Sequence, residues 1–376
     1  IGSGSREHAL AWKVRQSPYC DSLFVAPGNG GTADLATNLP IASTEVEQLV
    51  KAGLEKSIDL TLVGPETGLA MGVVDAFEQA GMSIFGPSKA AAEIESSKVF
   101  AKELMQRSGV PSAQSMTFDS YQEARTFLCN REAPIVIKPD GLTAGKGVVV
   151  AQTRQQALEA LELTMKERIY GNSGSRVVIE EYMEGVEVSV FAFTDGEAIS
   201  PLVAACDYKR AFEGDTGPNT GGMGAYSPPE FWNPTLSEKI LNQVFRPVIA
   251  ELAHIQRTFR GVLYAGLMLT QSGIRVVEFN ARLGDPEAQV ILPRLDTDLV
   301  EIAHAISNRN LSRTKIAWNE KMCVGIVITS KGYPDSYETG YSIDGLEQLG
   351  PDELVFHAGT TQFGDQKVTT GGRVLT

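Results

Sequence analysis

Short apolar runs alternate with amphipathic stretches over the N-terminal part of the chain. Three of these runs have the length of buried strands: 23–25, 58–63 and 82–85. Because helical periodicity fills the stretches between them, we predict a parallel sheet covered by helices. A longer helical pattern over 89–108 ends at Gly109, with Pro111 just beyond, so a second unit is expected to begin near Pro111.

The pattern changes in the middle of the chain. From 134 to 182 it predicts, in order, a strand, a glycine-rich loop, a strand at 148–150, a helix around 156–166 and a strand at 177–179. This compact segment is a candidate lid. The elements expected after it are strands over 186–205, a Gly/Pro-rich loop over 214–229, a helix over 237–256, and a hairpin of strands at 262–270 and 274–279. The tail from Met322 has strand signals but few residues for a core of its own.

Composition narrows the class of protein. The chain of 376 residues is 43% hydrophobic and 21% charged, which is typical of a folded globular protein of two or more units. Its net charge of -13 argues against a nucleic-acid partner. No apolar run of about 18 residues occurs, so we expect no membrane span and a cytoplasmic location. The four cysteines form no C-x-x-C pair, which argues against a zinc site or disulfide framework. Both ends lie in strand-like sequence, and we interpret them as truncated.

A glycine loop opens the chain. Gly2, Gly4 and the residues between them precede a helical pattern, where free backbone N–H groups could receive a phosphate. Glu7 stands where a dinucleotide fingerprint needs its third glycine, so a nucleotide or phosphosugar fits better than NAD. A tight turn without ligand is the alternative. Two further polar loops, 27–32 and 64–66, should reach the same sheet edge, where ligands of parallel sheets gather. There Glu66 could hold an amine or ribose hydroxyl, or simply be solvated.

A second glycine loop joins two predicted strands over 135–150. Its lysines, Lys138 and Lys146, could neutralise phosphate oxygens, while its glycines allow close backbone approach. A strand follows instead of a helix, so the loop is not a P-loop. A glycine-rich hairpin without ligand is the alternative reading.

An alternating strand carries Glu278, Asn280 and Arg282 on one face. A carboxylate and an amide oxygen two residues apart can bind one hard cation, and Mg²⁺ prefers such ligands together with waters and ATP phosphates. Arg282 would then lie beside the reacting phosphate or carboxylate. The polar face of a half-exposed strand is the alternative for Glu278 alone.

These motifs occur in an order that resembles the phosphoribosylamine-glycine ligase family of the ATP-grasp superfamily, over nearly the whole chain. The landmarks are G-S-G-S-R-E-H-A-L (2–10), A-P-G-N (26–29), G-P-E (64–66), S-K-V-F-A-K (97–102), K-P-D-G-L-T-A-G-K-G-V-V-V (138–150), E-E-Y-M-E-G-V-E-V-S (180–189), D-Y-K-R (207–210), P-N-T-G-G-M-G-A-Y-S-P (218–228) and E-F-N-A-R-L-G-D-P-E-A-Q (278–289). The sequence departs from the family pattern at Ser5, Pro139 and Thr143, where glycine, alanine and alanine are expected.

The resemblance implies an α/β and α+β multidomain fold. A Rossmann-like, parallel-sheet domain that binds substrate is expected at 1–88. An ATP-grasp catalytic domain with a small mobile lid, at about 111–182, is expected at 89–318, and an incomplete β-rich C-terminal domain at 319–376. The protein would be a monomer or part of a longer multifunctional chain.

The resemblance also implies a reaction and a set of site residues. Glycine would be activated by ATP as glycyl phosphate and joined to 5-phosphoribosylamine, giving glycinamide ribonucleotide, ADP and phosphate. Catalysis is assigned to Arg282, Lys146 and Asp285. ATP would be bound by Lys98, Lys138, Gly145, Lys146, Gly147, Glu180, Glu181, Tyr182 and Glu187. Glu278 and Asn280 would hold Mg²⁺ or Mn²⁺. The substrates would be bound by Gly4, Gly28, Asn29, Glu66, Asp207, Lys209, Asn219, Gly221 and Arg282.

Two rival functions stay open at this point. The first is an ATP-grasp carboxylate-amine ligase that activates a different acid, and residues 207–210 with the Asn219 loop should distinguish it because they would touch the substrate. The second is a catalytically silent nucleotide-binding module, against which Glu278, Asn280 and the loop lysines argue.

Overall fold

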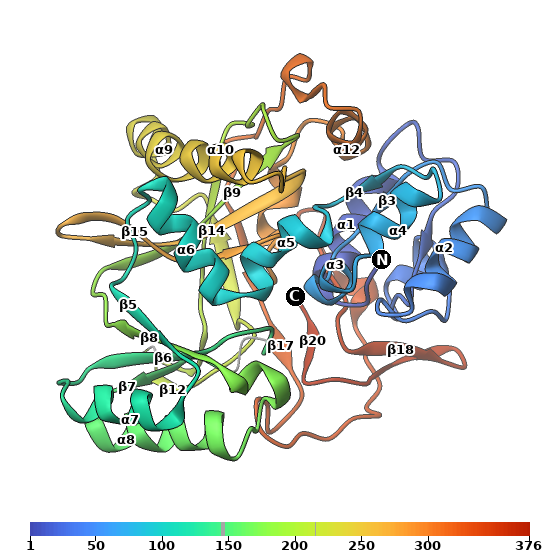
Figure 1. Cartoon of the computed structure of the whole chain (residues 1–376). Helices are drawn as coiled ribbons and strands as arrows, with labels where there is room; N and C mark the ends of the chain where they lie inside the picture. The colour runs from blue at the N-terminus through green and yellow to red at the C-terminus, as the bar shows by residue number, and fades with distance from the viewer. Residues whose placement is uncertain (144–146, 215) are drawn as a thin grey trace.

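The computed structural model describes residues 1–143, 147–214 and 216–376 (Figure 1). Its N-terminal region contains the predicted parallel sheet: β1 pairs with β2, and β3 with β4. Ile1 and Gly2 lie between these pairs, since Gly2 N–H donates to Ala26 at 2.6 Å and the amino group of Ile1 donates to Leu62 at 2.8 Å. The elements are α1 (Ser5–Arg15), β1 (Phe24–Val25), η1 (Thr32–Asp34), β2 (Thr37–Asn38), α2 (Val46–Glu55), β3 (Thr61–Leu62), α3 (Glu66–Met71), α4 (Val73–Gln79) and β4 (Ile84–Phe85).

The long helix predicted over 89–108 was wrong, because the chain forms two helices, α5 (Lys89–Ser96) and α6 (Lys98–Ser108). Ser97 between them has an extended backbone, with φ -132° and ψ 113°. Its hydroxyl accepts the Phe100 N–H at 3.1 Å and donates to Asp140 at 3.0 Å. Ser97 thus starts α6 as a cap, and the first residue of the helix, Lys98, reaches the loop at 140–142. The end of α6 at Gly109 (φ 68°) is as predicted.

The segment between α6 and residue 182 forms a small antiparallel sheet of order β5-β8-β6-β7. Helices α7 and α8 cover one face of it, and their apolar side chains form a separate core with the strands (Figure 1). The helix expected around 156–166 begins at Arg154, capped by Thr153, and its last turn is a π-helix. The elements are β5 (Ser115–Phe118), α7 (Tyr121–Cys129), β6 (Ile135–Pro139), β7 (Val149–Ala151), α8 (Arg154–Leu161), η2 (Glu162–Lys166), η3 (Gly171–Ser175) and β8 (Val177–Glu181).

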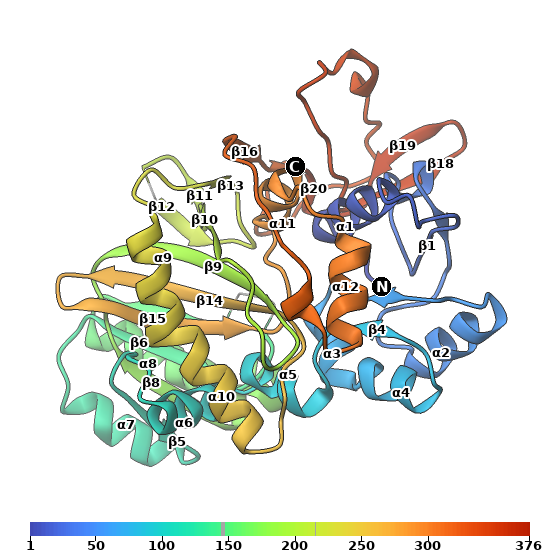
Figure 2. The same ribbon diagram turned by 90° about the horizontal axis from the view of Figure 1, so that it is seen from above.

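The larger, six-stranded sheet has the order β15-β14-β9-β10-β13-β16. Helices α9 and α10, joined by the π-helix η4, lie across it, as Figure 2 shows, and bury one of its faces. The predicted β14–β15 hairpin is confirmed. The loop predicted over 214–229 was wrong in part, since it contains β12 and β13. The elements are β9 (Val186–Thr194), β10 (Val203–Asp207), β11 (Arg210–Phe212), β12 (Thr216–Asn219), β13 (Gly224–Ser227), α9 (Pro234–Ile240), η4 (Leu241–Phe245), α10 (Arg246–His254), β14 (Gly261–Thr270) and β15 (Gly273–Asn280).

The C-terminal segment returns to the N-terminal region. The β18–β19 hairpin lies beside the first loops, where the Gly30 N–H donates to Thr360 at 3.1 Å (Figure 1). No helix within 1–143, 147–214 and 216–376 is long and apolar enough to cross a membrane. The elements are α11 (Ala288–Ile291), η5 (Leu292–Arg294), α12 (Leu299–Ser307), η6 (Leu311–Arg313), β16 (Cys323–Ile326), β17 (Ile328–Thr329), η7 (Leu346–Gln348), β18 (Thr360–Phe363), β19 (Gln366–Thr369) and β20 (Arg373–Leu375).

Candidate active site

The small sheet meets the large sheet at the edge strand β15. Nζ of Lys138, on β6, donates to the carbonyl of Val277 at 3.1 Å. The N–H of Val276 donates to Pro111, in the linker before β5, at 2.8 Å. The predicted phosphate-binding strand and the predicted metal-binding strand are therefore neighbours, although 139 positions separate Lys138 from Val277 in the chain.

Three lysines gather at this junction. Lys98 Nζ donates to the Gly141 carbonyl at 2.8 Å, and burial lowers its pKa although Glu278 opposes the shift. Lys138 is buried and pairs with Glu180 Oε2 at 2.9 Å. Lys102 pairs with Glu180 Oε1 at 3.0 Å. The sequence analysis missed Lys102, although it follows Lys98 by four residues and so lies on the same face of α6.

The predicted ATP-binding residues of β8 and β9 have different surroundings. The Glu180 carboxylate is enclosed between the two lysines. Glu181 instead pairs with Arg275 at 2.6 Å and accepts the Gln114 N–H at 2.9 Å, and Tyr182 is exposed. Glu187 pairs with Lys209. The structure thus turns Glu180 and Glu187 toward other predicted site residues, while the Glu181 side chain connects β8 to β15.

The second glycine loop lies only partly within the described residues. Gly145 and Lys146 are outside them. Gly147 is described, and a Cβ there would fall 2.5 Å from Thr143 Oγ1 and 2.6 Å from Pro139 Cγ. The two residues that depart from the family pattern in this loop therefore pack against a glycine that has no space for a side chain.

Glu278 and Asn280 end β15 in a strongly cationic environment. Burial would raise the pKa of Glu278, but Lys209, Lys138, Lys98 and Arg282 outweigh burial and hold the pKa below its usual range. Neither side chain makes a hydrogen bond or ion pair with another residue of the described ranges. Their oxygens are therefore available to a divalent cation, which fits the predicted pair. No cluster of three His, Cys, Asp or Glu side chains suited to a metal occurs in the part of the chain that is described.

Arg282 lies just beyond β15, which ends at Asn280, so the prediction that it belongs to the same strand was wrong. Its guanidinium pairs with Glu95 at 2.7 Å and with Glu66 at 3.3 Å. Burial opposes the charge, yet these two carboxylates raise the pKa of Arg282 above its usual value. Glu95 also accepts the Ala281 N–H at 2.7 Å. The sequence analysis missed Glu95, because a single Glu in a helix of ordinary pattern carries no signal of a distant partner.

The first glycine loop is closed by its own helix. Glu7 accepts the Gly4 N–H at 2.6 Å and pairs with Arg6, also at 2.6 Å. The phosphate prediction assumed that the Gly4 N–H is free. In the structure Glu7 of α1 binds it, because the helix caps its own N-terminal loop. A Cβ at Gly4 would fall 3.3 Å from Asp285 Oδ2, so the loop approaches the predicted catalytic residue.

The three loops of the N-terminal sheet meet as predicted, and Glu66 of the third loop lies 3.8 Å from Arg6 beside the first. The amide of Asn29 donates to Ser3 at 2.9 Å and to His357 at 2.7 Å. Its oxygen accepts the Gly31 N–H at 2.9 Å. Asn29 therefore organises the loops, and its substrate role stays a prediction. Gly28 has φ 76°, and a Cβ there would fall 2.2 Å from Asn38 Oδ1.

Asp207 ends β10 and Lys209 follows it, near the carboxylate of Glu187 on β9. Nζ of Lys209 pairs with Glu187 and lies 4.0 Å from Asp207. Burial raises the pKa of Asp207 to about 7, although Lys209 opposes the shift. Asn219 is paired with Arg210 across the β11–β12 ribbon.

Gly221 and Asp285 come together through Arg373 of β20. Arg373 donates to the Gly221 carbonyl at 2.5 Å and pairs with Asp285 at 3.2 Å. Burial would raise the pKa of Asp285, but Arg373 and Arg6 lower it. Arg373 belongs to a segment whose sequence pattern carries no site motif, so the sequence analysis missed it.

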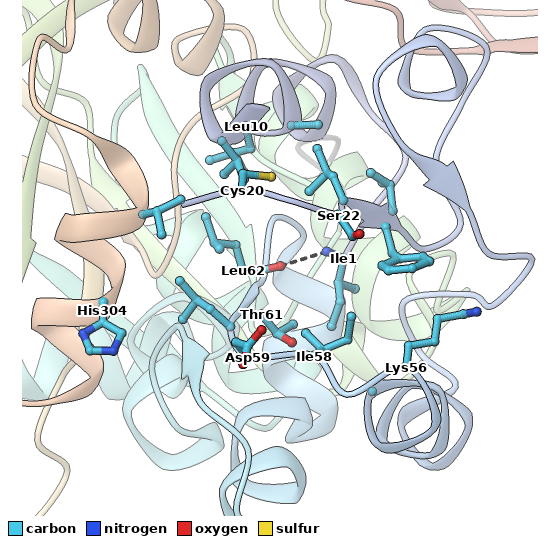
Figure 3. A pocket seen from close by; sticks show the side chains of 18 of the residues that line it. Ile1, Leu10, Cys20, Ser22, Lys56, Ile58, Asp59, Thr61, Leu62 and His304 are labelled. Atoms are coloured by element: carbon cyan, nitrogen blue, oxygen red, sulfur yellow. Dashed lines mark hydrogen bonds between the residues drawn. The ribbon is translucent and has the colours of Figure 1, made fainter. Parts of the chain in front are cut away.

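A cavity of about 1010 Å³ lies in the N-terminal region, lined by residues of β1, β3 and α12 together with Ile1 (Figure 3). Leu10, Phe24, Leu62 and Phe77 are among its mainly apolar lining residues. Because Lys98, Lys138 and the metal pair do not line it, the cavity is not the candidate site.

Comparisons with known proteins point to one family along the whole chain. Three models of phosphoribosylglycinamide synthetase match in order: the N domain at 1–95, the ATP-grasp (A) domain at 96–288 and the C domain at 323–376. The phosphoribosylamine–glycine ligase of Halalkalibacterium halodurans is 50% identical over 376 residues, which are 100% of this chain and 87% of that protein.

Solved structures include a member of the same family and a more distant protein of similar fold. The crystal structure of phosphoribosylamine–glycine ligase from Thermotoga maritima has a TM-score of 0.86 and 34% identity, covering 100% of this chain and 90% of that one. The biotin carboxylase domain of the Hydrogenobacter thermophilus 2-oxoglutarate carboxylase, in complex with MgADP, has a TM-score of 0.70 at 15% identity, covering 100% and 83%. The second likeness concerns the fold alone.

Proposed function

This chain belongs to the phosphoribosylglycinamide synthetase family of ATP-grasp enzymes, and from that membership we propose which residues carry its reaction. It is an ATP-dependent ligase of purine biosynthesis that joins glycine to 5-phosphoribosylamine. One observation supports the site best: the carboxylate of Glu278 has no direct partner among the described residues, yet four cationic side chains surround it.

Lys98 and Lys138 neutralise the phosphates of ATP. Lys138 is buried and Lys98 half-buried at the junction of the two sheets, where a reduced dielectric strengthens their attraction for an anion. Glu180 holds Lys138 in place, and Lys102 shares that carboxylate. The charges are thus arranged before ATP arrives, which lowers the cost of organising them during the reaction.

Glu278 and Asn280 hold a divalent cation, Mg²⁺ or Mn²⁺. When bound, it would supply positive charge to the phosphate oxygens of ATP. The chain's own contribution is two oxygen ligands on rigid backbone at the end of β15.

Arg282 steadies the acyl phosphate formed when the carboxylate of glycine attacks the γ-phosphate of ATP. The bond to ADP breaks as the new bond forms, and the amine of phosphoribosylamine then displaces phosphate from the carbonyl carbon. Glu66 and Glu95 fix the plane of the Arg282 guanidinium. Asp207, Lys209 and the loop around Gly221 hold the two substrates, so the chain acts by positioning and charge compensation.

The test is ADP release by the purified protein with Mg-ATP and phosphoribosylamine, with and without glycine. We expect release to depend on glycine, and other amino acids or bicarbonate not to replace it. Release that is independent of glycine, or that another acid supports better, would contradict the assignment.

Glu278→Gln tests the metal pair. It keeps the shape of the side chain but removes its charge, so we expect turnover to fall by about 100-fold or more with an unchanged circular dichroism spectrum. Glu238→Gln, an exposed position on α9, is the matched control. Wild-type turnover in Glu278→Gln would remove Glu278 from the site.

A further inference from the structure

The loop 218–224, which carries two predicted substrate-binding residues, is held by the C-terminal segment at one residue. Gly221 N–H donates to the hydroxyl of Tyr333 at 3.0 Å. The carbonyl of the same residue accepts Nη1 of Arg373 at 2.5 Å. Both polar groups of the Gly221 backbone are therefore bound by side chains more than 100 positions away in the chain.

Arg373 also connects this loop to Asp285. Its Nη1 lies 3.2 Å from both the carbonyl and the carboxylate Oδ1 of Asp285. One nitrogen thus faces three oxygens from two separate loops. A planar guanidinium can present its hydrogens to such a set, whereas the ammonium of lysine ends a flexible chain and lacks that fixed geometry.

Close packing fixes the two side chains relative to each other. A Cβ at Gly221 would fall 2.9 Å from Cζ of Arg373, so the guanidinium lies directly against the glycine. A Cβ at Gly372 would fall 2.4 Å from Cδ2 of Tyr333, so the tyrosine ring lies against the residue before Arg373. Pairing of β17 with β20 holds Arg373 in register. The three residues Gly221, Tyr333 and Arg373 form what we call the C-terminal clamp.

We propose that Tyr333 and Arg373 are positioning residues of the ligase, which hold the 218–224 loop against Asp285 and so set the binding of glycine and phosphoribosylamine. Neither residue contacts Lys98, Lys138, Glu278 or another predicted ATP-binding residue in the described ranges. The inference rests on the proposed function of the loop. It adds which two side chains of the C-terminal segment hold the loop.

Two conservative variants test the clamp. Tyr333→Phe removes one neutral hydrogen bond, for which we expect a rise in KM for phosphoribosylamine or glycine of about 2- to 10-fold. Arg373→Lys keeps the charge but loses the shared contacts, for which we expect a loss in kcat/KM of about 10- to 100-fold. KM for ATP should stay within about twofold of wild type in both. Because both side chains act through Gly221, the double variant should lose less than the product of the single losses.

Matched controls separate positioning from general damage. Tyr337→Phe removes a hydroxyl from the neighbouring ring, whose centroid lies 6.3 Å from that of Tyr333 and whose hydroxyl bonds to no described residue. Arg260→Lys changes an arginine that pairs with Glu78 outside the site. Both controls should retain wild-type kinetics.

Kinetics, melting temperature and calorimetric binding of ADP and of glycinamide ribonucleotide are measured for every variant. Weaker binding of glycinamide ribonucleotide with unchanged ADP binding supports the clamp. Equal losses for both ligands, or wild-type kinetics in Tyr333→Phe and Arg373→Lys, would overturn it. If wild-type protein shows no glycine-dependent ADP release, the proposed function fails. The clamp proposal fails as well only if wild-type protein also does not bind glycinamide ribonucleotide.

Discussion

Glu95→Gln tests how the reacting centre is held together. Glu95 lies on α5 and is 2.7 Å from Arg282, while Glu66 lies 3.3 Å from the same guanidinium. At an effective dielectric constant of about 20, the attraction is about 6 kcal/mol for the first pair and about 5 kcal/mol for the second. Desolvation of the buried charges offsets most of this gain. Removing one partner of a buried pair typically costs about 3–5 kcal/mol.

Because Glu66 still compensates Arg282, we expect the lower end of that range, about 3 kcal/mol. For a chain of 376 residues, the unfolding entropy of about 2 cal/mol/K per residue converts this loss into a fall in melting temperature of about 4 °C. Arg282 would also lose its fixed orientation, since Glu95 holds both the guanidinium and the Ala281 N–H. We therefore expect kcat to fall about 10- to 100-fold.

The assay combines thermal unfolding with glycine-dependent ADP release. Glu93→Gln is the control, because Glu93 lies on the same helix and its ion pair with Arg257 is 30–40% exposed. An exposed pair contributes about 0–1 kcal/mol to stability, so this control should have nearly the melting temperature and the turnover rate of wild type. If Glu95→Gln behaves like Glu93→Gln, the argument that Glu95 positions Arg282 is refuted.

Three further predictions concern buried groups. The pKa of Asp207 is raised from 3.8 to about 7, so its contribution to stability is present below pH 4 and lost as the pH rises to 7. In Asp207→Asn the melting temperature should therefore change less with pH over that range than in wild type. The pKa of His8 is lowered by burial from 6.5 to about 3, so the stability it contributes is lost as the pH falls below 6.5; His8→Gln should reduce this acid sensitivity in the same measurement. The hydroxyl of Ser5 donates to the Phe356 carbonyl at 3.2 Å, so Ser5→Ala should lower the free energy of unfolding in urea by about 1 kcal/mol, and an unchanged midpoint would show that this bond contributes nothing.

Elements with a strong local signal were predictable. The N-terminal parallel sheet and the β14–β15 hairpin follow from apolar runs and turn residues. The break at Ser97 was not, because the apolar spacing continues across it, and the break depends on a bond to Asp140. Strand β13 was missed because glycine and proline dominate its surroundings. It exists because β10 and β16 pair with it on both sides.

The sequence by itself determined the family and the reaction, because ordered motifs specify a chemistry without any knowledge of distances. Only the tertiary structure showed which further residues hold the predicted ones in place. Glu95 with Arg282, Lys102 with Glu180 and Arg373 with Gly221 are separated in the chain by 187, 78 and 152 positions. Such pairs leave no periodic trace, because their partners meet through tertiary packing of elements far apart in the chain and not through local geometry.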